Sequence, residues 1–331
     1  MKKAIRTVFF VLGIYFLVTW ALAAVSLEKG FGRRDQIPQT ELTYSDEMRS
    51  VYPRKEISFP SGKNLLHGWL YSDGDLSDDP GLILVVHGLG GGANTHLAET
   101  FAFSDHGYAV LSYDGTGTRE SEGRGVRGLY QATCDLDAAL EYVQTLDEPD
   151  NLPVFVYGHS AGGYAAAAVL KEHPEINGVI CISAFDRPLE EMMAQAKKRA
   201  GITAYLGYPG LALQYRVLFG PGANRSAADA LSASGVPALI IAGTEDEVVP
   251  NAVSLYACKD RIRDPYATFL LVEEPYRNGH NGLWFTAGAN RARERMAQQK
   301  ASADPAACNE LDATFMNTVF AFLDEAALIK E

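Results

Sequence analysis

The chain has 331 residues, of which 47% are hydrophobic and 21% charged, so it can bury a full core, and one large α/β domain fits its length. Its formal net charge of −12 argues against a nucleic-acid partner, because phosphates need a basic protein face. The four cysteines, at positions 134, 181, 258 and 308, show neither a Cys-x-x-Cys pair nor metal-ligand spacing, so we expect no metal and no other cofactor.

Residues 1–26 predict a membrane anchor or a signal segment. Basic residues at positions 2, 3 and 6 precede an uncharged run over 8–25, which is long enough to cross the hydrocarbon core of a bilayer as a helix. The alternative is a cleaved signal peptide, because Ala21-Leu22-Ala23 resembles a small-residue cleavage site. We therefore expect a protein anchored in the membrane by this helix, or one secreted after cleavage.

The orientation of this segment is barely decided by charge, because Lys29, Arg33 and Arg34 nearly balance the basic residues before the run. We expect the domain that follows to lie outside the cytoplasm, although a cytoplasmic domain stays open. In an oxidising compartment Cys258 and Cys308 are a conceivable disulfide pair. Cys181 lies inside an apolar strand run and is expected to be a buried free thiol.

Residues 27–53 mix charges with glycine and proline without an apolar period, so we expect a spacer between the membrane and the domain. The segments 55–59 and 65–71 flank Pro60-Ser61-Gly62, a turn signal, and predict an antiparallel hairpin at a sheet edge. His67 lies in the second strand and is expected to be structural, because a lone histidine among apolar residues is usually packed.

Buried strands and helices then alternate. The apolar run 82–86 predicts a central parallel strand and ends in His87-Gly88-Leu89-Gly90-Gly91-Gly92, where glycines let backbone N–H groups turn toward a ligand. A helix over 95–106, a strand over 108–113, a loop starting at Asp114 and a helix over 131–146 follow. This alternation predicts βαβ units and a doubly wound sheet.

The stretch 153–163 is an apolar run, the sequence Gly158-His159-Ser160-Ala161-Gly162, and the start of an alanine-rich helix. A serine hydroxyl becomes nucleophilic when a base takes its proton, and it must stand clear of the backbone to reach a carbonyl. The glycines at 158 and 162 allow the strained turn this requires. The helix beginning at Ser160 also brings unpaired N–H groups to the same place. The stretch predicts an exposed nucleophilic serine beside part of an oxyanion site.

The alternation breaks after a strand predicted over 178–183. Residues 186–234 contain two helical stretches and no predicted strand, so we expect a lid outside the carboxyl ends of the strands. Its aromatic residues either line an acyl or alkyl pocket or pack the lid onto the sheet. They are Tyr205, Tyr208, Tyr215 and Phe219. Strands over 236–242 and 268–273, a polar surface segment over 287–308 and an amphipathic helix over 311–328 complete a domain spanning 54–331.

These motifs resemble the α/β-hydrolase superfamily over roughly residues 55–328, with Gly158–Gly162 as its nucleophile elbow. The order of elements looks most like the serine aminopeptidase and monoacylglycerol-lipase-like group. The resemblance implies an α/β-hydrolase fold, a doubly wound, mostly parallel sheet of about eight strands with a small helical lid.

The resemblance also implies a catalytic triad with Ser160 as nucleophile. The segment 243–250 matches the family's Gly-x-x-Asp-x-x-x-Pro pattern, which points to Asp246 as the acid, with Asp186 as the alternative because some relatives place the acid there. The family order is nucleophile, acid, histidine, and His280 is the only histidine after His173. His280, with glycines on both sides, is therefore the expected base.

Other roles also come from the resemblance. The oxyanion donors are expected to be the backbone N–H groups of Leu89 and Ala161. His87, Asp114 and Arg119 are expected to shape their loops rather than take part in chemistry.

The implied activity is hydrolysis of a small-molecule carboxylic ester, or of a thioester or amide, through an acyl-enzyme. Two alternatives stay open. One is an acyltransferase, in which an alcohol or amine displaces water at the acyl-enzyme. The other is a hydrolase-fold protein without catalysis that binds a partner at the cell surface. The sequence leaves the oligomeric state undetermined.

Overall fold

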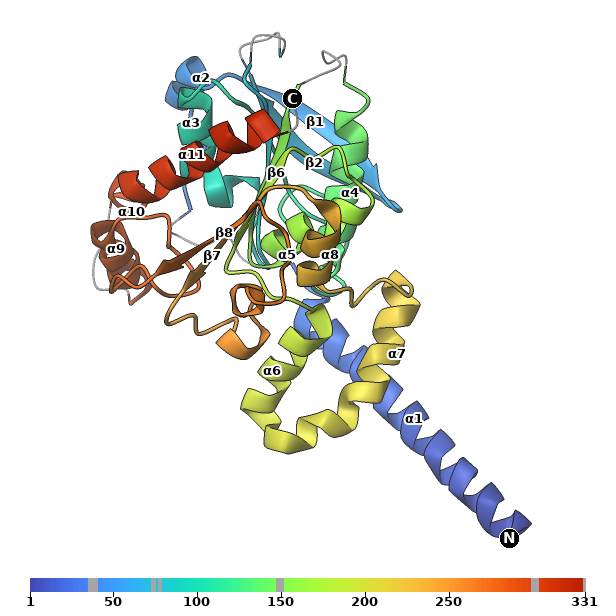
Figure 1. Ribbon diagram of the computed structural model, residues 1–331. Helices are drawn as coiled ribbons and strands as arrows, with labels where there is room; N and C mark the ends of the chain where they lie inside the picture. Colours follow the sequence, from blue (N-terminus) through green and yellow to red (C-terminus); the bar gives the residue numbers. More distant parts are fainter. Residues whose placement is uncertain (35–40, 73–75, 77–78, 147–151, 299–303, 330–331) are drawn as a thin grey trace.

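Figure 1 shows the computed structural model of the chain, which describes residues 1–331 apart from 35–40, 73–75, 77–78, 147–151, 299–303 and 330–331. Among the described residues, eight strands form one sheet in the order β1-β2-β4-β3-β5-β6-β7-β8. Both pairings of β2 are antiparallel, and the pairs from β3 to β8 are parallel. The strands are β1 (Arg54–Ser61), β2 (Asn64–Tyr71), β3 (Leu82–Val86), β4 (Ala109–Tyr113), β5 (Val154–His159), β6 (Gly178–Ile182), β7 (Ala238–Gly243) and β8 (Ala267–Val272). The predicted sheet and its edge hairpin are confirmed.

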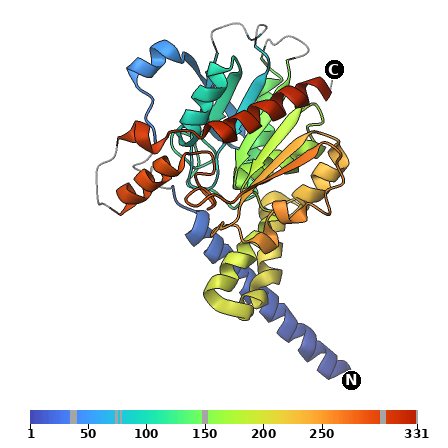
Figure 2. The same cartoon turned by 60° about the vertical axis from the view of Figure 1, so that its left-hand side comes forward.

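The continuous apolar runs of the central strands follow from burial on both faces. In β3, Leu82 and Leu84 contribute to one core and Ile83 and Val85 to the other, because successive side chains point to opposite faces. One core is closed by α4 (Gln131–Val143), α5 (Ala161–Ala168) and α8 (Ala227–Ser234), and the other by α3 (Leu97–Asp105) and α11 (Ala313–Ile329). Figures 1 and 2 show these helices on either side of the sheet.

Between β6 and α8 the chain leaves the sheet and forms α6 (Pro188–Ala200), the 3-10 segment η4 (Gly201–Gly207) and α7 (Tyr208–Phe219). We call these three elements the lid. The predicted lid reaches residue 234, but α8 packs Ala227, Ala228 and Leu231 into the core instead. Small apolar side chains suit that helix to close packing against α5.

The N-terminal helix α1 (Lys2–Phe31) projects from the molecule and lies beside the lid along its second half (Figures 1 and 2). Of the helices that the structure describes, α1 is the one long and apolar enough to cross a membrane. It continues five residues past the expected end of the anchor at 26, and Thr19, Ala23 and Leu27 are its buried residues.

The described part of the expected spacer packs onto the domain. Arg34 donates hydrogen bonds to the carbonyls of Arg119 and Ser121, and the Tyr52 ring stacks on Phe101 with 4.0 Å between centroids. These contacts involve single side chains without a repeating apolar pattern, which is why the sequence suggests a linker. The short elements are α2 (Asp46–Val51), η2 (Ala93–His96), η3 (Val169–Lys171), η5 (Asn251–Val253), η6 (Tyr256–Cys258), α9 (Ala287–Ala297) and α10 (Pro305–Cys308).

All four cysteines are free, so the conceivable disulfide between Cys258 and Cys308 is not formed. Cys258, the last residue of η6, has its Sγ 3.3 Å from Arg261 Nη1, whereas Cys308 Sγ lies 3.3 Å from Met296 Sδ. Each sulfur is buried against its own partner, and nothing brings the two together. Cys181 is a buried free thiol in β6, as predicted.

Candidate active site

Ser160 occupies a strained turn between β5 and α5. Its φ of 55° and ψ of −115° lie in a region that side chains rarely adopt. A Cβ atom at Gly158 would lie 2.3 Å from the Gly162 carbonyl oxygen, and one at Gly162 would lie 2.2 Å from the Val86 carbonyl oxygen. Only glycine allows β3, β5 and α5 to approach so closely, which confirms the role predicted for these two positions.

A chain of hydrogen bonds joins three loops at the carboxyl end of the sheet. His280 Nε2 lies 3.0 Å from Ser160 Oγ, and His280 Nδ1 lies 2.8 Å from Asp246 Oδ2 and 3.0 Å from its Oδ1. Asp246 Oδ1 also accepts hydrogen bonds from the backbone N–H groups of Val248 and Val249, at 2.9 and 2.7 Å. The structure therefore brings together the three side chains that the sequence predicts as nucleophile, base and acid.

The partners of His280 fix its tautomer. Nδ1 faces a carboxylate and therefore carries the proton, which leaves Nε2 free to accept the hydroxyl proton of Ser160. His280 is 5% exposed and the Asp246 side chain 8% exposed, so water competes little for either contact. The arrangement can move a proton from the serine hydroxyl to the imidazole.

Three groups outside the predicted set hold the backbone of His280. His159 Nε2 and Ser183 Oγ each donate to the His280 carbonyl at 3.0 Å, and Glu247 Oε2 accepts from the His280 N–H at 3.2 Å. Burial, and then the neighbouring imidazole of His280, lower the pKa of His159 well below its ordinary value, so this ring is neutral. The sequence offers no signal for these contacts, because a bond to a backbone carbonyl leaves no residue pattern.

The acid loop and the histidine loop are also joined directly. A Cβ atom at Gly243 would lie 2.2 Å from the Asn278 carbonyl oxygen. That same carbonyl accepts from Glu245 N–H at 2.8 Å, and Asn278 Nδ2 donates to Thr244 Oγ1 at 3.0 Å. Asp246 and His280 are therefore carried by two loops that are in direct backbone contact.

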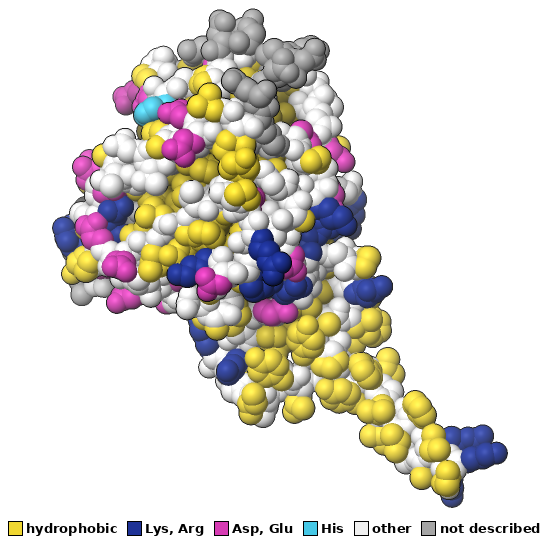
Figure 3. Space-filling model, viewed as in Figure 1, with side chains coloured by type: hydrophobic (Ala, Val, Ile, Leu, Met, Phe, Trp, Pro, Cys, Tyr) yellow, Lys and Arg dark blue, Asp and Glu magenta, His cyan; other side chains and the backbone are white. Residues whose placement is uncertain are grey.

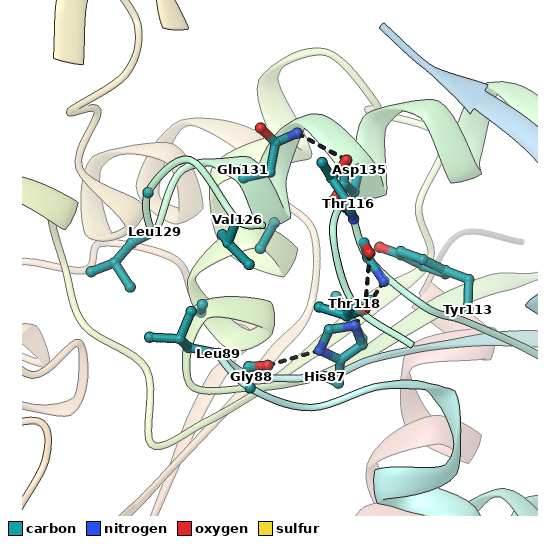
Figure 4. A pocket seen from close by; sticks show the side chains of 16 residues that line it. His87, Gly88, Leu89, Tyr113, Thr116, Thr118, Val126, Leu129, Gln131 and Asp135 are labelled. Atoms are coloured by element: carbon teal, nitrogen blue, oxygen red, sulfur yellow. Dashed lines mark hydrogen bonds between the residues drawn. The ribbon is translucent and has the colours of Figure 1, made fainter. Parts of the chain in front are cut away.

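Leu89 and Ala161, the predicted oxyanion donors, line one small cavity of ≈ 30 Å³ beside the elbow, which is room for about one water molecule. Figure 4 shows Leu89 and Leu129 at one side of this cavity and Thr116 at the other. Ala161 is the first residue of α5, where an N–H group has no acceptor within the helix. A Cβ atom at Gly88 would lie 3.0 Å from Ser160 Cβ, so the two loops touch.

His87, Asp114 and Arg119 hold the surrounding loops in place. His87 accepts the Gly115 N–H through Nε2 at 2.9 Å and contacts the Gly88 carbonyl through Nδ1 at 2.7 Å. Burial lowers the pKa of this imidazole, which suits a neutral ring with one donor and one acceptor. Asp114 Oδ1 accepts the Ala93 N–H at 2.8 Å, and Arg119 pairs with Glu41 at 2.8 Å.

Asp186, the alternative acid, caps α8 instead of reaching His280. Its Oδ1 accepts from Ser226 Oγ at 2.6 Å and from Ala228 N–H at 3.0 Å, and its Oδ2 accepts from Arg261 at 3.0 Å. Burial raises the pKa of Asp186, but these hydrogen bonds outweigh burial and hold the pKa below its ordinary value.

The four lid aromatics divide between the two predicted roles. Tyr215 is buried and its hydroxyl accepts the Leu129 N–H at 2.8 Å, while Phe219 packs 5.3 Å from the Tyr215 ring. Tyr205 and Tyr208 instead line a cavity of ≈ 680 Å³ together with Met193 on α6. The lid therefore both packs onto the domain and covers a hollow.

Glu191 lies at the base of the lid and is buried. Gln195 donates to its Oε1 at 2.7 Å, whereas its Oε2 has no hydrogen-bond partner among the described residues. Burial raises the pKa of Glu191 and outweighs the hydrogen bond from Gln195, which lowers it. Across the described residues, no three His, Cys, Asp or Glu side chains are grouped to hold a metal ion.

Residues 78–226 match the family of serine aminopeptidases S33. RutD of Caulobacter segnis, whose name describes a carbamate hydrolase, is 30% identical over 125 residues, which are 37% of this chain and 43% of that protein. WAV2 of Arabidopsis thaliana, named as an α/β-hydrolase domain-containing protein, is 28% identical over 182 residues, 54% of this chain and 56% of the relative.

These matches span about half the length of the curated relatives, 43% and 56%. Among solved structures, the esterase Pf2001 of Pyrococcus furiosus aligns with a TM-score of 0.57 at 16% identity, covering 80% of this chain and 97% of that one. The two chains therefore share one fold.

Proposed function

Since this chain belongs to the α/β-hydrolase superfamily, we propose that it is a serine hydrolase that cleaves a small carboxylic ester through an acyl-enzyme on Ser160. The observation that carries the proposal is the hydrogen-bonded chain from Ser160 through His280 to Asp246, with distances of 3.0 and 2.8 Å. A base within hydrogen-bond reach of the nucleophile, held by a third group, is the arrangement that acyl transfer requires.

The proposed reaction has two halves. His280 takes the Ser160 hydroxyl proton while Oγ attacks the carbonyl carbon, and the N–H groups of Leu89 and Ala161 donate to the resulting oxyanion. His280 then gives its proton to the leaving alcohol, and the ester C–O bond breaks. A water molecule, deprotonated by His280, attacks the acyl-enzyme, and the acid leaves as Ser160 regains its proton. Asp246 stabilises the imidazolium throughout.

The decisive experiment replaces the nucleophile. Ser160→Ala removes all but about 10³–10⁴ of the rate enhancement over water, so hydrolysis of p-nitrophenyl esters should fall below detection. Labelling by a fluorophosphonate probe should disappear as well, whereas Ser50→Ala, at an exposed serine of α2, should label fully. Continued labelling of the Ser160→Ala protein would contradict the proposal, as would a protein that never labels.

The substrate is best approached with graded probes. A series of p-nitrophenyl esters of rising chain length tests whether the cavity under the lid accepts an acyl chain. Adding an alcohol or amine acceptor at rising concentration separates hydrolysis from acyl transfer, because a transferase forms the new ester or amide at the expense of the free acid.

Aminoacyl amides are the second candidate substrates, because Glu191 at the base of the lid offers a buried carboxylate oxygen that has no partner among the described residues. Such an oxygen would suit the ammonium group of a free amino terminus. If this is the natural class, Glu191→Gln raises KM for aminoacyl amides and leaves KM for simple esters unchanged.

For localisation, the proposed state is a chain anchored by α1 with the catalytic domain outside the cytoplasm. Support comes from the length and apolar character of α1. The alternative is secretion after cleavage near residue 23, which the mass of the mature protein distinguishes.

A further inference from the structure

The lid carries an apolar surface that faces away from the domain. The side chains of Ile202, Leu206 and Val217 are 73%, 63% and 61% exposed, and Arg216 is the only charged residue in 201–219. Figure 3 shows hydrophobic side chains running from the lid onto α1. A large exposed patch of this kind is uncommon on soluble proteins and marks a site of contact with a protein or a membrane.

Helix α1 is fixed to this lid by specific contacts. The Tyr15 hydroxyl donates to the Leu206 carbonyl at 2.6 Å, and Trp20 Nε1 donates to Gln214 Oε1 at 2.6 Å. A Cβ atom at Gly210 would lie 2.2 Å from the Thr19 carbonyl carbon, so α7 and α1 touch through their backbones. Between Tyr15 and Trp20, α1 therefore has the lid as its neighbour.

The length of α1 then limits where the lid can lie. Residues 2–14 precede the lid contacts, and at a rise of about 1.5 Å per residue they extend about 20 Å. A bilayer has a hydrocarbon core of about 30 Å. If α1 crosses that core, the remaining third of the distance, about 10 Å, must be spanned by the part of α1 that contacts the lid. The lid then enters the membrane together with α1.

We propose that α1 and the lid form one membrane-embedded unit, in which η4 and α7 lie in the bilayer leaflet nearest the domain. Ile202, Leu206 and Val217 then face acyl chains of a phospholipid bilayer, which is the partner of this surface. The exposed basic residues at the end of α6 suit the phosphates of the headgroups. These are Lys197, Lys198 and Arg199. This membrane placement rests on the proposed anchor, whereas the substrate class drawn from it below rests on the proposed function.

The embedded lid would also deepen the proposed function. The cavity of ≈ 680 Å³ lies between lid residues such as Met193 and Tyr208 and the segment around Val253. That segment follows the Asp246 loop in the chain. On the hydrolase activity proposed above, we expect membrane lipid esters, whose acyl chains lie in the same leaflet as the lid, to be cleaved in preference to soluble esters.

The depth of the lid can be measured directly. The full chain carries a single added cysteine, Ile202→Cys, Leu206→Cys or Val217→Cys, bearing a nitroxide in phosphatidylcholine vesicles. The matched control is Val51→Cys on α2, 64% exposed and remote from α1 (Figure 1). The unsubstituted chain gives the background, because three native cysteines are buried and Cys134 is half-buried.

We expect nitroxides at 202, 206 and 217 to collide with dissolved oxygen more than with a water-soluble nickel chelate, and the reverse at 51. Equal access of the chelate to the lid positions and to position 51 would overturn the proposal. Recovery of a chain cleaved near residue 23 would overturn it too, because Tyr15 and Trp20 would be lost.

A second variant tests the substrate class. Leu206→Glu with Val217→Glu places charges on the exposed lid face, and such charges cost several kcal/mol in hydrocarbon, so the ratio of vesicle-ester to soluble-ester hydrolysis should fall about tenfold or more. An unchanged ratio would refute lipid delivery through the lid. Failure of the hydrolase proposal would be seen in a different measurement. The Ser160→Ala protein would still hydrolyse soluble esters, while the nitroxide depths would stay as expected.

Discussion

His159 supports the site without touching a substrate. Its Nε2 lies 3.0 Å from the His280 carbonyl oxygen, and because burial keeps the ring neutral, this nitrogen donates the bond. Its position immediately before Ser160 ties the nucleophile and the base to one strand end. His159 is thus a positioning residue, and Ser183 shares that work through a second bond to the same carbonyl.

The neutral state of His159 predicts a pH dependence of stability. Because its pKa is lowered on folding, the unfolded chain binds the proton more tightly, so stability is full above the unfolded pKa of about 6.5 and falls below it by up to about 1.4 kcal/mol per pH unit. His159→Gln keeps an N–H donor but cannot ionise. We expect its thermal midpoint in detergent to drop less between pH 7.5 and 5.5 than that of the natural chain.

The matched control for this measurement is His106→Gln, at an exposed histidine, which should drop as much as the natural chain. Equal losses in the His159→Gln protein and the natural chain would mean that His159 does not resist protonation in the folded state. A fall in kcat at unchanged KM in the His159→Gln protein would separately support the role of His159 in positioning His280.

Asp186 and Asp246 both follow parallel strands, and the elements after each strand decide which aspartate serves the site. Asp186 after β6 accepts bonds from Ser226 and Ala228 at the start of α8, whereas Asp246 after β7 faces His280. We expect Asp186→Asn to lower the free energy of unfolding by about 1–3 kcal/mol and to keep ester hydrolysis. Asp246→Asn should instead lower kcat by about 10⁴ with little change in the thermal midpoint. If the Asp186→Asn protein lost ester hydrolysis and the Asp246→Asn protein kept it, the acid of the triad would be Asp186 and not Asp246.

Much of the sheet follows from sequence because each central strand is an apolar run ending in a distinctive loop. The runs at 82–86 and 178–183 correspond to β3 and β6 within one residue. The proximity of Ser160, Asp246 and His280 follows from the resemblance and the strand order. Their catalytic roles stay predictions until the substitutions are made.

Other features escape the sequence because they depend on distant partners. The contact of Tyr15 with the Leu206 carbonyl joins residues 191 positions apart, and a backbone acceptor gives no pattern to detect. The assignment of α8 to the core rather than the lid turns on Ala227 and Ala228, small residues that also suit a surface helix. Residues 27–53 read as a spacer because isolated aromatic contacts lack periodicity.

At the scale of the whole molecule, α1, the lid and the sheet form a series of contacts. Helix α1 touches the lid at Thr19 and Trp20, and α6 of the lid touches the acid loop through Lys198, whose Nζ donates to the Glu247 carbonyl at 2.7 Å. Glu247 in turn accepts the His280 N–H. Helix α1 is therefore linked to the site through the lid and the acid loop, and loosening its contact with the lid should free the lid while the sheet stays folded.

Gly210→Val tests that series at its first contact. Its Cβ would meet the Thr19 carbonyl carbon at 2.2 Å, and backbone atoms cannot rotate away, so α1 and α7 must separate at a cost of about 1–3 kcal/mol. Gly207→Val is the matched control, since no atom lies within 4 Å of its Cβ. We expect trypsin to cut the Gly210→Val lid, at residues such as Arg216, about tenfold faster than the control lid, because the lost contact with α1 makes opening of the lid less costly.

The thermal midpoint of the domain should stay close to that of the control, because the face of α7 that contacts α1 belongs to neither core of the sheet. Equal cleavage of the two variants would mean that the contact between α1 and α7 does not hold the lid in place in solution.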